Sequence, residues 1–122
     1  MVIDDSEVDL YLAKRIIAKH SFAEDILLID FATDALEYLR LHANEIDALP
    51  EYIFLDVNMP GMNGFEFLHA FEQLPGNVKS HCKVIMLTTS VNVKDKQRAL
   101  DNPWVKQYIN KPLSSDKLQT II

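Results

Sequence analysis

The chain has 122 residues, which is enough for one domain with a substantial hydrophobic core and too few for two. Hydrophobic residues make up 48% of the sequence and charged residues 25%, an ordinary composition for a soluble globular domain. The formal net charge of −6 argues against non-specific binding to nucleic acid, which needs clustered Lys and Arg. An acidic chain of this kind is instead expected to attract cations.

No segment has the pattern of a membrane span or of a secretion signal. No apolar run approaches the ~20 residues that a span needs, and the N-terminus lacks a basic region followed by an apolar stretch and a cleavage site. We therefore expect a cytoplasmic protein. The single cysteine, Cys82, precedes an apolar segment and is expected to be a small core residue. The four histidines share no metal-ligand spacing with it or with each other; they are His20, His42, His69 and His81.

The chain opens on three apolar residues, a predicted strand that runs directly into Asp4 and Asp5. Residues 6–19 have the spacing of an amphipathic helix, with Ser6 and Asp9 in a capping arrangement at its start. The apolar face expected for this helix consists of Val8, Leu12 and Ile16, widened by Leu10, Ala13 and Ile17.

Strand and helix patterns alternate along the rest of the chain. Residues 47–50 are predicted to be a loop, and Pro75 and Pro103 to end the helices before them. The further strands are expected at residues 26–29, 52–55, 83–88 and 105–109. The further helices are expected at residues 33–43, 65–73 and 93–100 after an Asn92 cap, followed by a short last helix capped by Ser114 or Ser115. The inward positions are Ala35, Leu36 and Leu39 in the helix at 33–43, and Leu118, Ile121 and Ile122 in the last helix.

Five alternations of strand and helix predict an α/β fold of βαβ units, with a doubly wound five-stranded parallel sheet and helices on both faces. We expect one domain over residues 1–122. Only three residues precede the acidic pair, whereas strands usually have ~5 or 6. The N-terminal strand and the last helix, which stops after about two turns, are therefore expected to be incomplete.

Asp56 follows an uninterrupted apolar run, Tyr52-Ile53-Phe54-Leu55, which is typical of a strand buried on both faces of a parallel sheet. Pro60, Gly61 and Gly64 then break the strand pattern. Ligand chemistry in open α/β sheets gathers outside the carboxyl ends of the strands. Asp56 thus stands either as a group of an active site or, more simply, as a residue that caps a turn.

Other polar residues follow the other predicted strands. If the sheet is parallel, Asp4, Asp5, Asp56, Thr88 and Lys111 all lie at the same edge of it. Three clustered carboxylates repel one another unless a cation joins them, and Mg²⁺ prefers oxygen ligands of this kind. A carboxylate nucleophile, a metal, an ammonium and a hydroxyl suit phosphoryl transfer, because its catalysis is mostly positioning and charge neutralisation.

Four motifs together resemble the receiver domain of two-component response regulators, and the resemblance covers essentially the whole chain. They are Asp4-Asp5, the segment from Asp56 to Gly64 (DVNMPGMNG), the segment from Val84 to Thr88 (VIMLT) and the segment from Tyr108 to Pro112 (YINKP). The resemblance implies the flavodoxin-like strand order 2-1-3-4-5, which the chemotaxis member of the family also has.

The resemblance also assigns roles to single residues. Asp56 is implied as the phosphoacceptor, with Thr88 as the switch hydroxyl, Lys111 as the phosphoryl-binding lysine and Tyr108 as the switch aromatic. The Mg²⁺ ligands it implies are Asp5, Asp56, Asp4 through water and the backbone carbonyl of Asn58. Asn58 and Ser90 occupy the positions that tune the lifetime of the phosphoryl group.

By the same resemblance the chain is a bacterial-type signalling domain rather than an enzyme, since it catalyses only its own phosphorylation and autodephosphorylation. The implied donor is a sensor histidine kinase or a histidine phosphotransfer protein. Phosphorylation is expected to change the surface formed by the helix at 93–100, the strand at 105–109 and the last helix. A downstream protein or an output domain would read that surface. No direct binding to nucleic acid or membrane is implied.

Three other functions compete with this one. A haloacid-dehalogenase-type phosphatase would need a second aspartate where Asn58 stands, and a flavin-binding module would place Asp4 and Asp5 against the flavin phosphate. A receiver-like interaction domain that takes no phosphate is the strongest rival. The chain also departs from the family in its long link at residues 41–51 and in Thr89, which replaces a smaller residue.

Overall fold

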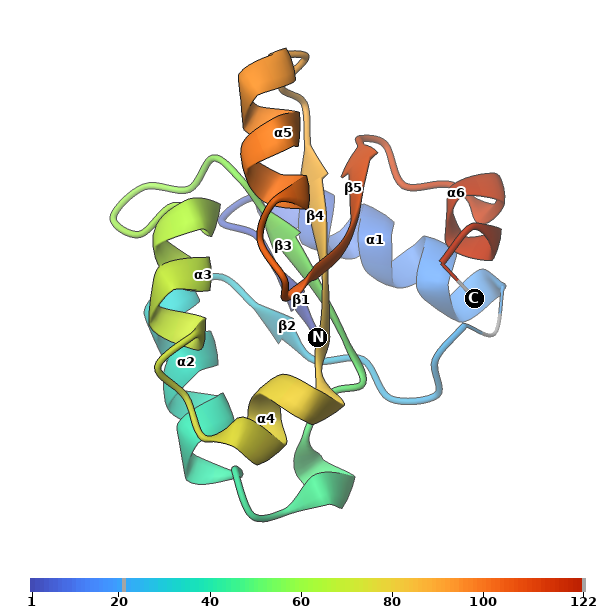
Figure 1. The fold of residues 1–122 in the computed structure, drawn as a ribbon. Coiled ribbons are helices and arrows are strands. Elements are labelled where there is room, and N and C mark those ends of the chain that lie inside the picture. The colour runs from blue at the N-terminus through green and yellow to red at the C-terminus, as the bar shows by residue number, and fades with distance from the viewer. Residues whose placement is uncertain (21, 122) are drawn as a thin grey trace.

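The computed structural model of the chain describes residues 1–20 and 22–121. Five parallel strands form one sheet in the order β2-β1-β3-β4-β5 (Figure 1). The prediction of a flavodoxin-like α/β fold is therefore confirmed. The strands are β1 (Val2–Ile3), β2 (Leu28–Ile29), β3 (Tyr52–Asp56), β4 (Lys83–Thr88) and β5 (Val105–Asn110).

Helices cover both faces of the sheet (Figure 1). The helices α1 (Glu7–Lys19) and α6 (Ser115–Gln119) lie on one face. The other face carries α2 (Ala32–Leu41), α3 (Gly64–Phe71), α4 (Gly76–His81) and α5 (Val93–Leu100). A short 3₁₀ helix, η1 (Ile46–Ala48), precedes β3. No helix among the described residues is long and apolar enough to cross a membrane.

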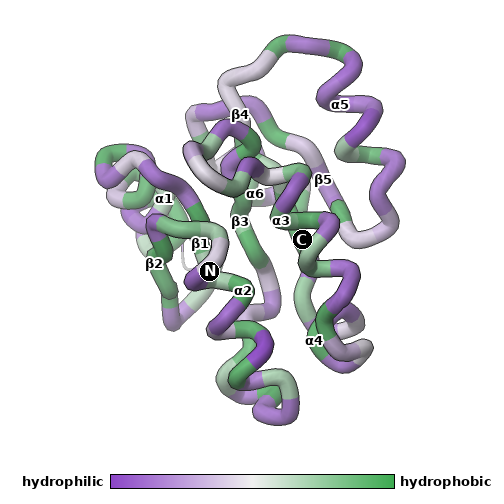
Figure 2. Tube along the Cα trace, turned by 90° about the vertical axis from the view of Figure 1, so that its left-hand side faces the viewer, coloured by the Kyte–Doolittle hydropathy of each residue, from purple (hydrophilic) through white to green (hydrophobic). Residues whose placement is uncertain are grey.

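The central strands send alternate side chains into two separate cores, because successive residues of a strand point to opposite faces. In β3, Ile53 and Leu55 join the core beneath α2 and α3, whereas Phe54 joins the core beneath α1 and α6. Figure 2 accordingly shows hydrophobic colour along β3. Cys82 is buried in the first core, as predicted, and this burial raises the pKa of its thiol to about 12.

The predicted inward face of α1 is wrong in part. Val8 and Leu12 are 66% and 47% exposed, and Ile16 is only partly buried. The helix instead turns a neighbouring stripe, spaced three and four residues apart, toward the sheet. That stripe consists of Leu10, Ala13 and Ile17, which were predicted only to widen the face.

Several element boundaries also differ from the prediction. The strand β2 is shorter than residues 26–29, because its partner β1 offers only two residues for pairing. The segment 47–50 was predicted to be a loop, but η1 includes its first two residues. The helix α4 was missed; it starts after Pro75, and Val78 fixes it to the core. The predicted inward positions Ala35, Leu39, Leu118 and Ile121 are buried and Leu36 is partly buried, whereas Ile122 lies outside the described residues.

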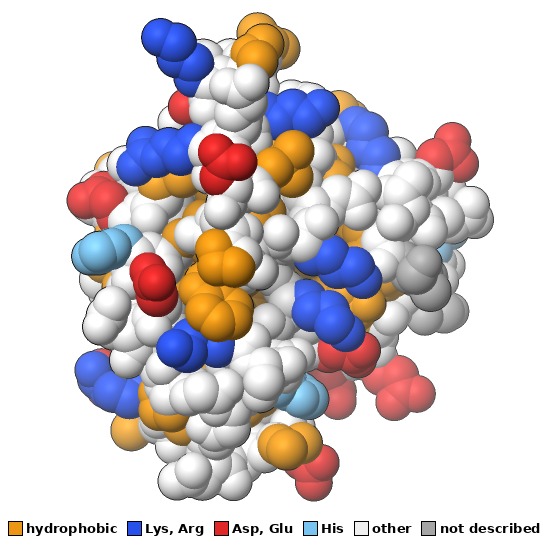
Figure 3. Space-filling view, in the orientation of Figure 1, with side chains coloured by type: hydrophobic (Ala, Val, Ile, Leu, Met, Phe, Trp, Pro, Cys, Tyr) orange, Lys and Arg blue, Asp and Glu red, His pale blue; other side chains and the backbone are white. Residues whose placement is uncertain are grey.

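The helix α5 projects beyond the carboxyl end of the sheet, and Ala99 is its one buried residue (Figure 1). Most of its length is hydrophilic in Figure 2. Its cations are Lys94, Lys96 and Arg98, and Lys and Arg side chains lie over this part of the molecule in Figure 3. Close to them, Val91 and Val93 are 91% and 67% exposed. The helix is thus held to the domain over a small area.

Candidate phosphoryl-transfer site

Asp56 is the last residue of β3, and it is buried between the ends of β1 and β4. The chain then turns sharply at Gly61, whose φ of +80° favours glycine, and returns to the strand end at the start of α3. Gly64 donates a backbone hydrogen bond to the carbonyl of Val57. A Cβ atom on Gly64 would lie 2.7 Å from the backbone oxygen of Asp56. Only glycine therefore fits where α3 meets the strand that carries Asp56.

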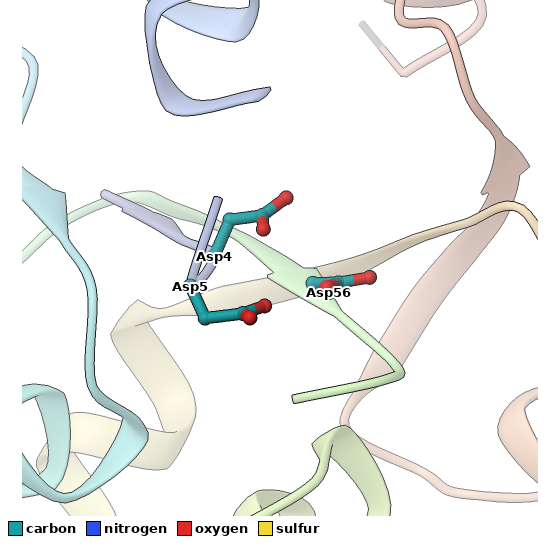
Figure 4. Close-up of side chains that lie close together, drawn as sticks. All are labelled: Asp4, Asp5 and Asp56. Carbon is teal, nitrogen blue, oxygen red and sulfur yellow. The ribbon is translucent and has the colours of Figure 1, made fainter. Parts of the chain in front are cut away.

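Asp4 and Asp5 follow β1 and bring two more carboxylates to Asp56. Each of the three side chains offers an oxygen that lies within 4.8 Å of the others, and Figure 4 shows the carboxylates side by side. Asp4 is buried and accepts a 2.9 Å hydrogen bond from the backbone N–H of Ser6, whereas Asp5 is exposed. This group confirms that the strand ends bring the predicted acidic residues together.

Burial and a neighbouring charge make Asp56 harder to ionise. Its pKa rises to about 6 from an ordinary value of 3.8; removal from water is the largest cause and the negative charge of Asp4 the second. The ammonium of Lys111 and a hydrogen bond from the backbone of Asn58 act in the opposite direction. The site therefore holds more negative charge than its one lysine neutralises.

Lys111 extends its ammonium into the acidic group from the end of β5. Its Nζ lies 2.7 Å from Oδ2 of Asp4 and 3.4 Å from Oδ1 of Asp56. Its backbone N–H donates to the carbonyl of Thr88, which fixes the lysine to the end of β4. Burial alone would lower the pKa of Lys111, but its hydrogen bonds and the surrounding carboxylates raise it well above the ordinary value. The ammonium thus stays charged.

The loop between β4 and α5 is held by hydrogen bonds that begin at Thr88. The Thr88 hydroxyl is fully buried and accepts from the backbone N–H of Ser90 at 2.9 Å, so its own proton remains available to donate. The Ser90 hydroxyl donates to Asp95 of α5, and the Ser90 carbonyl accepts from the Asn110 side chain, both at 2.9 Å. Ser90 therefore links the site to α5 and β5.

Tyr108 and Asn58 are two further predicted residues, and of these the backbone of Asn58 forms a hydrogen bond with Asp56. The ring of Tyr108 packs against the core beneath α2 and α3, and its hydroxyl is buried with no hydrogen-bond partner among the described residues. The side chain of Asn58 is exposed on the loop after β3. Neither side chain thus takes part in the contacts between Lys111 and the carboxylates.

Asp9 is a site residue that sequence reasoning missed. Its Oδ2 lies 2.9 Å from Nζ of Lys111, although 102 positions separate the two residues in the chain. The sequence shows Asp9 only as a partner in the cap of α1, and its backbone N–H does donate to the Ser6 hydroxyl. Which way the first turn of α1 faces depends on how the helix sits on the sheet, and no sequence pattern here reveals that.

The donor set suits a hard divalent cation. Mg²⁺ binds carboxylate oxygens together with water and substrate oxygens. The acidic group supplies carboxylate oxygens from Asp4, Asp5 and Asp56. Two of these residues are buried and one is exposed, which leaves the group open to solvent on one side. Because the three negative charges outnumber the one ammonium, a cation there would relieve their repulsion.

Comparison with known proteins agrees with this geometry. The family description "response regulator receiver domain" matches residues 1–122. The probable methanogenesis regulatory protein FilR2 of Methanothrix harundinacea is 30% identical over all of this chain, which covers 77% of that protein. The sensor histidine kinase CheAY of Helicobacter pylori is 33% identical, but this chain spans only 14% of its length.

Solved structures have the same fold. A two-component response regulator from Cytophaga hutchinsonii is 31% identical with a TM-score of 0.87, and the similarity covers 98% of this chain and 90% of that one. A response regulator receiver protein from Dyadobacter fermentans is 29% identical with a TM-score of 0.86, covering 98% and 91% of the two chains. With the strand order, the acidic strand ends and the family match over its whole length in agreement, the chain belongs to the response regulator receiver domain family.

Proposed function

We propose that this domain receives a phosphoryl group on Asp56 and works as a signalling switch in the cytoplasm. The observation that carries the proposal is the meeting of a buried carboxylate, Asp56, with the ammonium of Lys111 at 3.4 Å beside Asp4 and Asp5. Three relatives are named histidine kinases, which supports phosphohistidine as the donor. A sensor kinase or a histidine phosphotransfer protein would carry it.

In the transfer step an oxygen of Asp56 attacks the phosphorus of the donor. The bond from phosphorus to the donor nitrogen breaks, the imidazole leaves with the electron pair, and an acyl phosphate forms on Asp56. Lys111 neutralises one phosphoryl oxygen and the Thr88 hydroxyl donates to another. Mg²⁺ bound by Asp4, Asp5, Asp56 and the backbone carbonyl of Asn58 would supply the remaining charge neutralisation.

Hydrolysis by water returns the domain to its first state and releases inorganic phosphate. The exposed side of the acidic group admits that water, and Asn58 and Ser90 are the residues proposed to tune its access. The domain thus turns over only its own phosphoryl group. It transmits a signal and processes no external substrate.

The signal would leave the site through Thr88 and Ser90. A phosphoryl group adds negative charge and strong acceptors, which draw the Thr88 hydroxyl inward and pull on the hydrogen bonds of Ser90 to Asp95 and Asn110. Because the Tyr108 ring already packs inward, the expected movement is that of the loop and α5. The surface of α5, β5 and α6 changes with it. Since α5 carries Lys and Arg (Figure 3), we expect a downstream partner or output domain to present acidic side chains.

The test is the intact mass of the protein after incubation with acetyl phosphate, with Mg²⁺ or with a chelator. The wild type should gain the mass of one phosphate only with Mg²⁺, and Asp56→Ala should gain none. A folded wild type that gains nothing under any condition would contradict the proposal and favour the receiver-like domain that takes no phosphate.

A further inference from the structure

The ammonium of Lys111 contacts one carboxylate more than its proposed role requires. Its Nζ lies 2.7 Å from Asp4 and 2.9 Å from Asp9, both hydrogen-bond distances, but 3.4 Å from Asp56. Asp9 is not part of the acidic group that suits a cation. In this state the lysine is therefore bound more closely to the start of α1 than to the phosphoacceptor.

Ser6 forms hydrogen bonds with both aspartates that hold the lysine, with the carboxylate of Asp4 and with the backbone of Asp9. Its backbone N–H donates to Oδ1 of Asp4 at 2.9 Å, and its hydroxyl accepts from the backbone N–H of Asp9 at 3.2 Å. Each aspartate then has its Oδ2 directed at Lys111. The first turn of α1 thus places Asp9 opposite the end of β5, and the arrangement does not depend on a flexible side chain alone.

The two contacts differ in how easily they are given up. The Asp4 side chain is 5% exposed, whereas the Asp9 side chain is 38% exposed. Separating a buried carboxylate from its cation costs far more than separating an exposed one, because water solvates the exposed carboxylate afterwards. When a new oxygen needs a hydrogen bond from Lys111, Asp9 is therefore the partner that releases it.

We propose that Asp9 is a positioning residue that holds Lys111 toward α1 and competes with the incoming phosphoryl group for its ammonium. This inference rests on the proposed function. The three N–H groups of the ammonium already face Asp4, Asp9 and Asp56, and Asp56 is the most distant of the three, so a close hydrogen bond to a phosphoryl oxygen on Asp56 has to draw the ammonium away from Asp9. Asp9 thereby slows the capture of the phosphoryl group. It acts through Lys111 and does not touch the phosphorus.

The experiment compares Asp9→Asn with Glu7→Gln. Both variants remove one negative charge from the first turn of α1, but Glu7 is exposed and makes no ion pair among the described residues. The second-order rate constant for phosphorylation by acetyl phosphate is measured by intact mass at saturating Mg²⁺ for each protein. Asp9→Asn should raise it roughly three- to tenfold, the range of a partly exposed charge-assisted hydrogen bond. Glu7→Gln should change it less than about twofold.

Two further readouts separate a positioning role from a structural one. The hydrolysis rate of the phosphorylated protein should change less than about twofold in Asp9→Asn, because Lys111 holds the phosphoryl group both before and during hydrolysis. The NMR signal of the Lys111 ammonium should shift in Asp9→Asn and stay in place in Glu7→Gln. Asp9→Glu, which keeps the charge, should return the rate toward the wild type.

The outcomes that overturn the inference differ from those that overturn the proposed function. Equal rates for Asp9→Asn and Glu7→Gln, a lower rate for Asp9→Asn, or equal acceleration of phosphorylation and hydrolysis would refute the role of Asp9 while Asp56 remains the phosphoacceptor. A wild type that is never phosphorylated would refute the proposed function, and the role of Asp9 with it.

Discussion

Asp56 is ionised at neutral pH although its surroundings disfavour the charged form of its carboxyl group. The strand end removes it from water, and Asp4 adds a second buried negative charge. Lys111 offsets part of this cost but is shared with Asp4 and Asp9. Ionised Asp56 is therefore costly to keep without a cation, and it is well placed to bind one. These properties suit a site that becomes active only when the cation is bound.

The stability of the protein in a chelator should therefore depend on pH through Asp56. Its folded pKa of about 6 exceeds the ordinary 3.8, so the folded state keeps a proton that the unfolded chain has lost between these values. Stability then falls as pH rises through this window, by roughly 3 kcal/mol in total. Asp56→Asn removes the penalty. It should stabilise the protein at pH 7.5 by about 1 kcal/mol more than at pH 5, as measured by urea unfolding in a chelator. Equal gains at both pH values would contradict the shift.

Removal of the Lys111 ammonium should destabilise the protein, whereas removal of the Asp56 charge should stabilise it. Lys111→Met leaves Asp4 and Asp56 buried without their cation, a change that typically costs about 3 to 5 kcal/mol. Urea unfolding in a chelator should show this loss, and Mg²⁺ should recover part of it, because the metal would replace the missing positive charge. Lys14→Met, on the exposed face of α1, is the control and should change stability by less than about 0.5 kcal/mol. A loss that Mg²⁺ leaves unchanged would argue against a cation at the acidic group.

At the scale of elements, the sequence predicts some boundaries well for a physical reason. Both ends of β4 were predicted correctly, because a continuous apolar run lies between Lys83 and the polar Thr88. The inward face of α1 was predicted only in part, since Val8, Leu12 and Ile16 repeat as regularly as the neighbouring residues that are buried. Which stripe faces the core is decided by the sheet. The helix α4 was missed because its six residues have no apolar repeat.

The sequence predicts the residues of the site that follow strands, but it does not predict those placed by a helix or a loop. Asp4, Asp5, Asp56 and Lys111 follow strands, and the order of parallel strands brings strand ends together whatever the loops do. The contact of Asp9 depends on the rotation of a helix. The links from Ser90 to Asp95 and Asn110 depend on the course of a loop, and neither of these can be deduced from spacing. The sequence thus predicts the residues fixed by strands and misses those placed by helix rotation and loop path.

The junction of β3 and α3 offers a test at this scale. In Gly64→Ala the new methyl group would meet the Asp56 backbone oxygen at 2.7 Å and Met86 at 3.0 Å, so α3 or the strand end must shift. We expect a loss of about 1 to 3 kcal/mol in urea unfolding, with slower phosphorylation. Gly76→Ala is the matched control. Outside its own helix and its neighbours in the chain, no described atom lies within 4 Å of its added Cβ, so stability should stay the same or rise slightly. Equal stabilities of the two variants would contradict the close approach.

Across the whole molecule, α5 has weaker packing than the elements around it. The helices α2 and α3 bury large residues such as Leu39, Phe67 and Phe71, whereas α5 buries only Ala99. Two further contacts hold α5 in place, the Arg98 guanidinium 4.1 Å from the centre of the Phe65 ring and the Ser90 bond to Asp95. Elements with few buried contacts open at the lowest free energy. A signal from the site should therefore appear first in α5.

Hydrogen exchange should show directly that α5 responds to phosphorylation and that the well-packed helices do not. Phosphorylation by acetyl phosphate with Mg²⁺ should change amide exchange in residues 89–100 and 105–113, because the Thr88 hydroxyl turns toward the phosphoryl group and strains the hydrogen bonds that Ser90 makes to α5 and β5. Exchange in α2 and in the 3₁₀ helix should stay the same, since these elements lie outside that network.

Thr88→Val is the control that separates the signal from the chemistry. Valine keeps the shape of threonine but has no hydroxyl, so this variant should still take a phosphoryl group on Asp56, more slowly, while residues 89–100 no longer respond to it. A Thr88→Val protein whose exchange still changes on phosphorylation would show that the signal leaves by another route. Exchange changes spread evenly over all helices would instead mean that the site stabilises the domain as a whole, and that the weak packing of α5 has no part in selecting where the molecule responds.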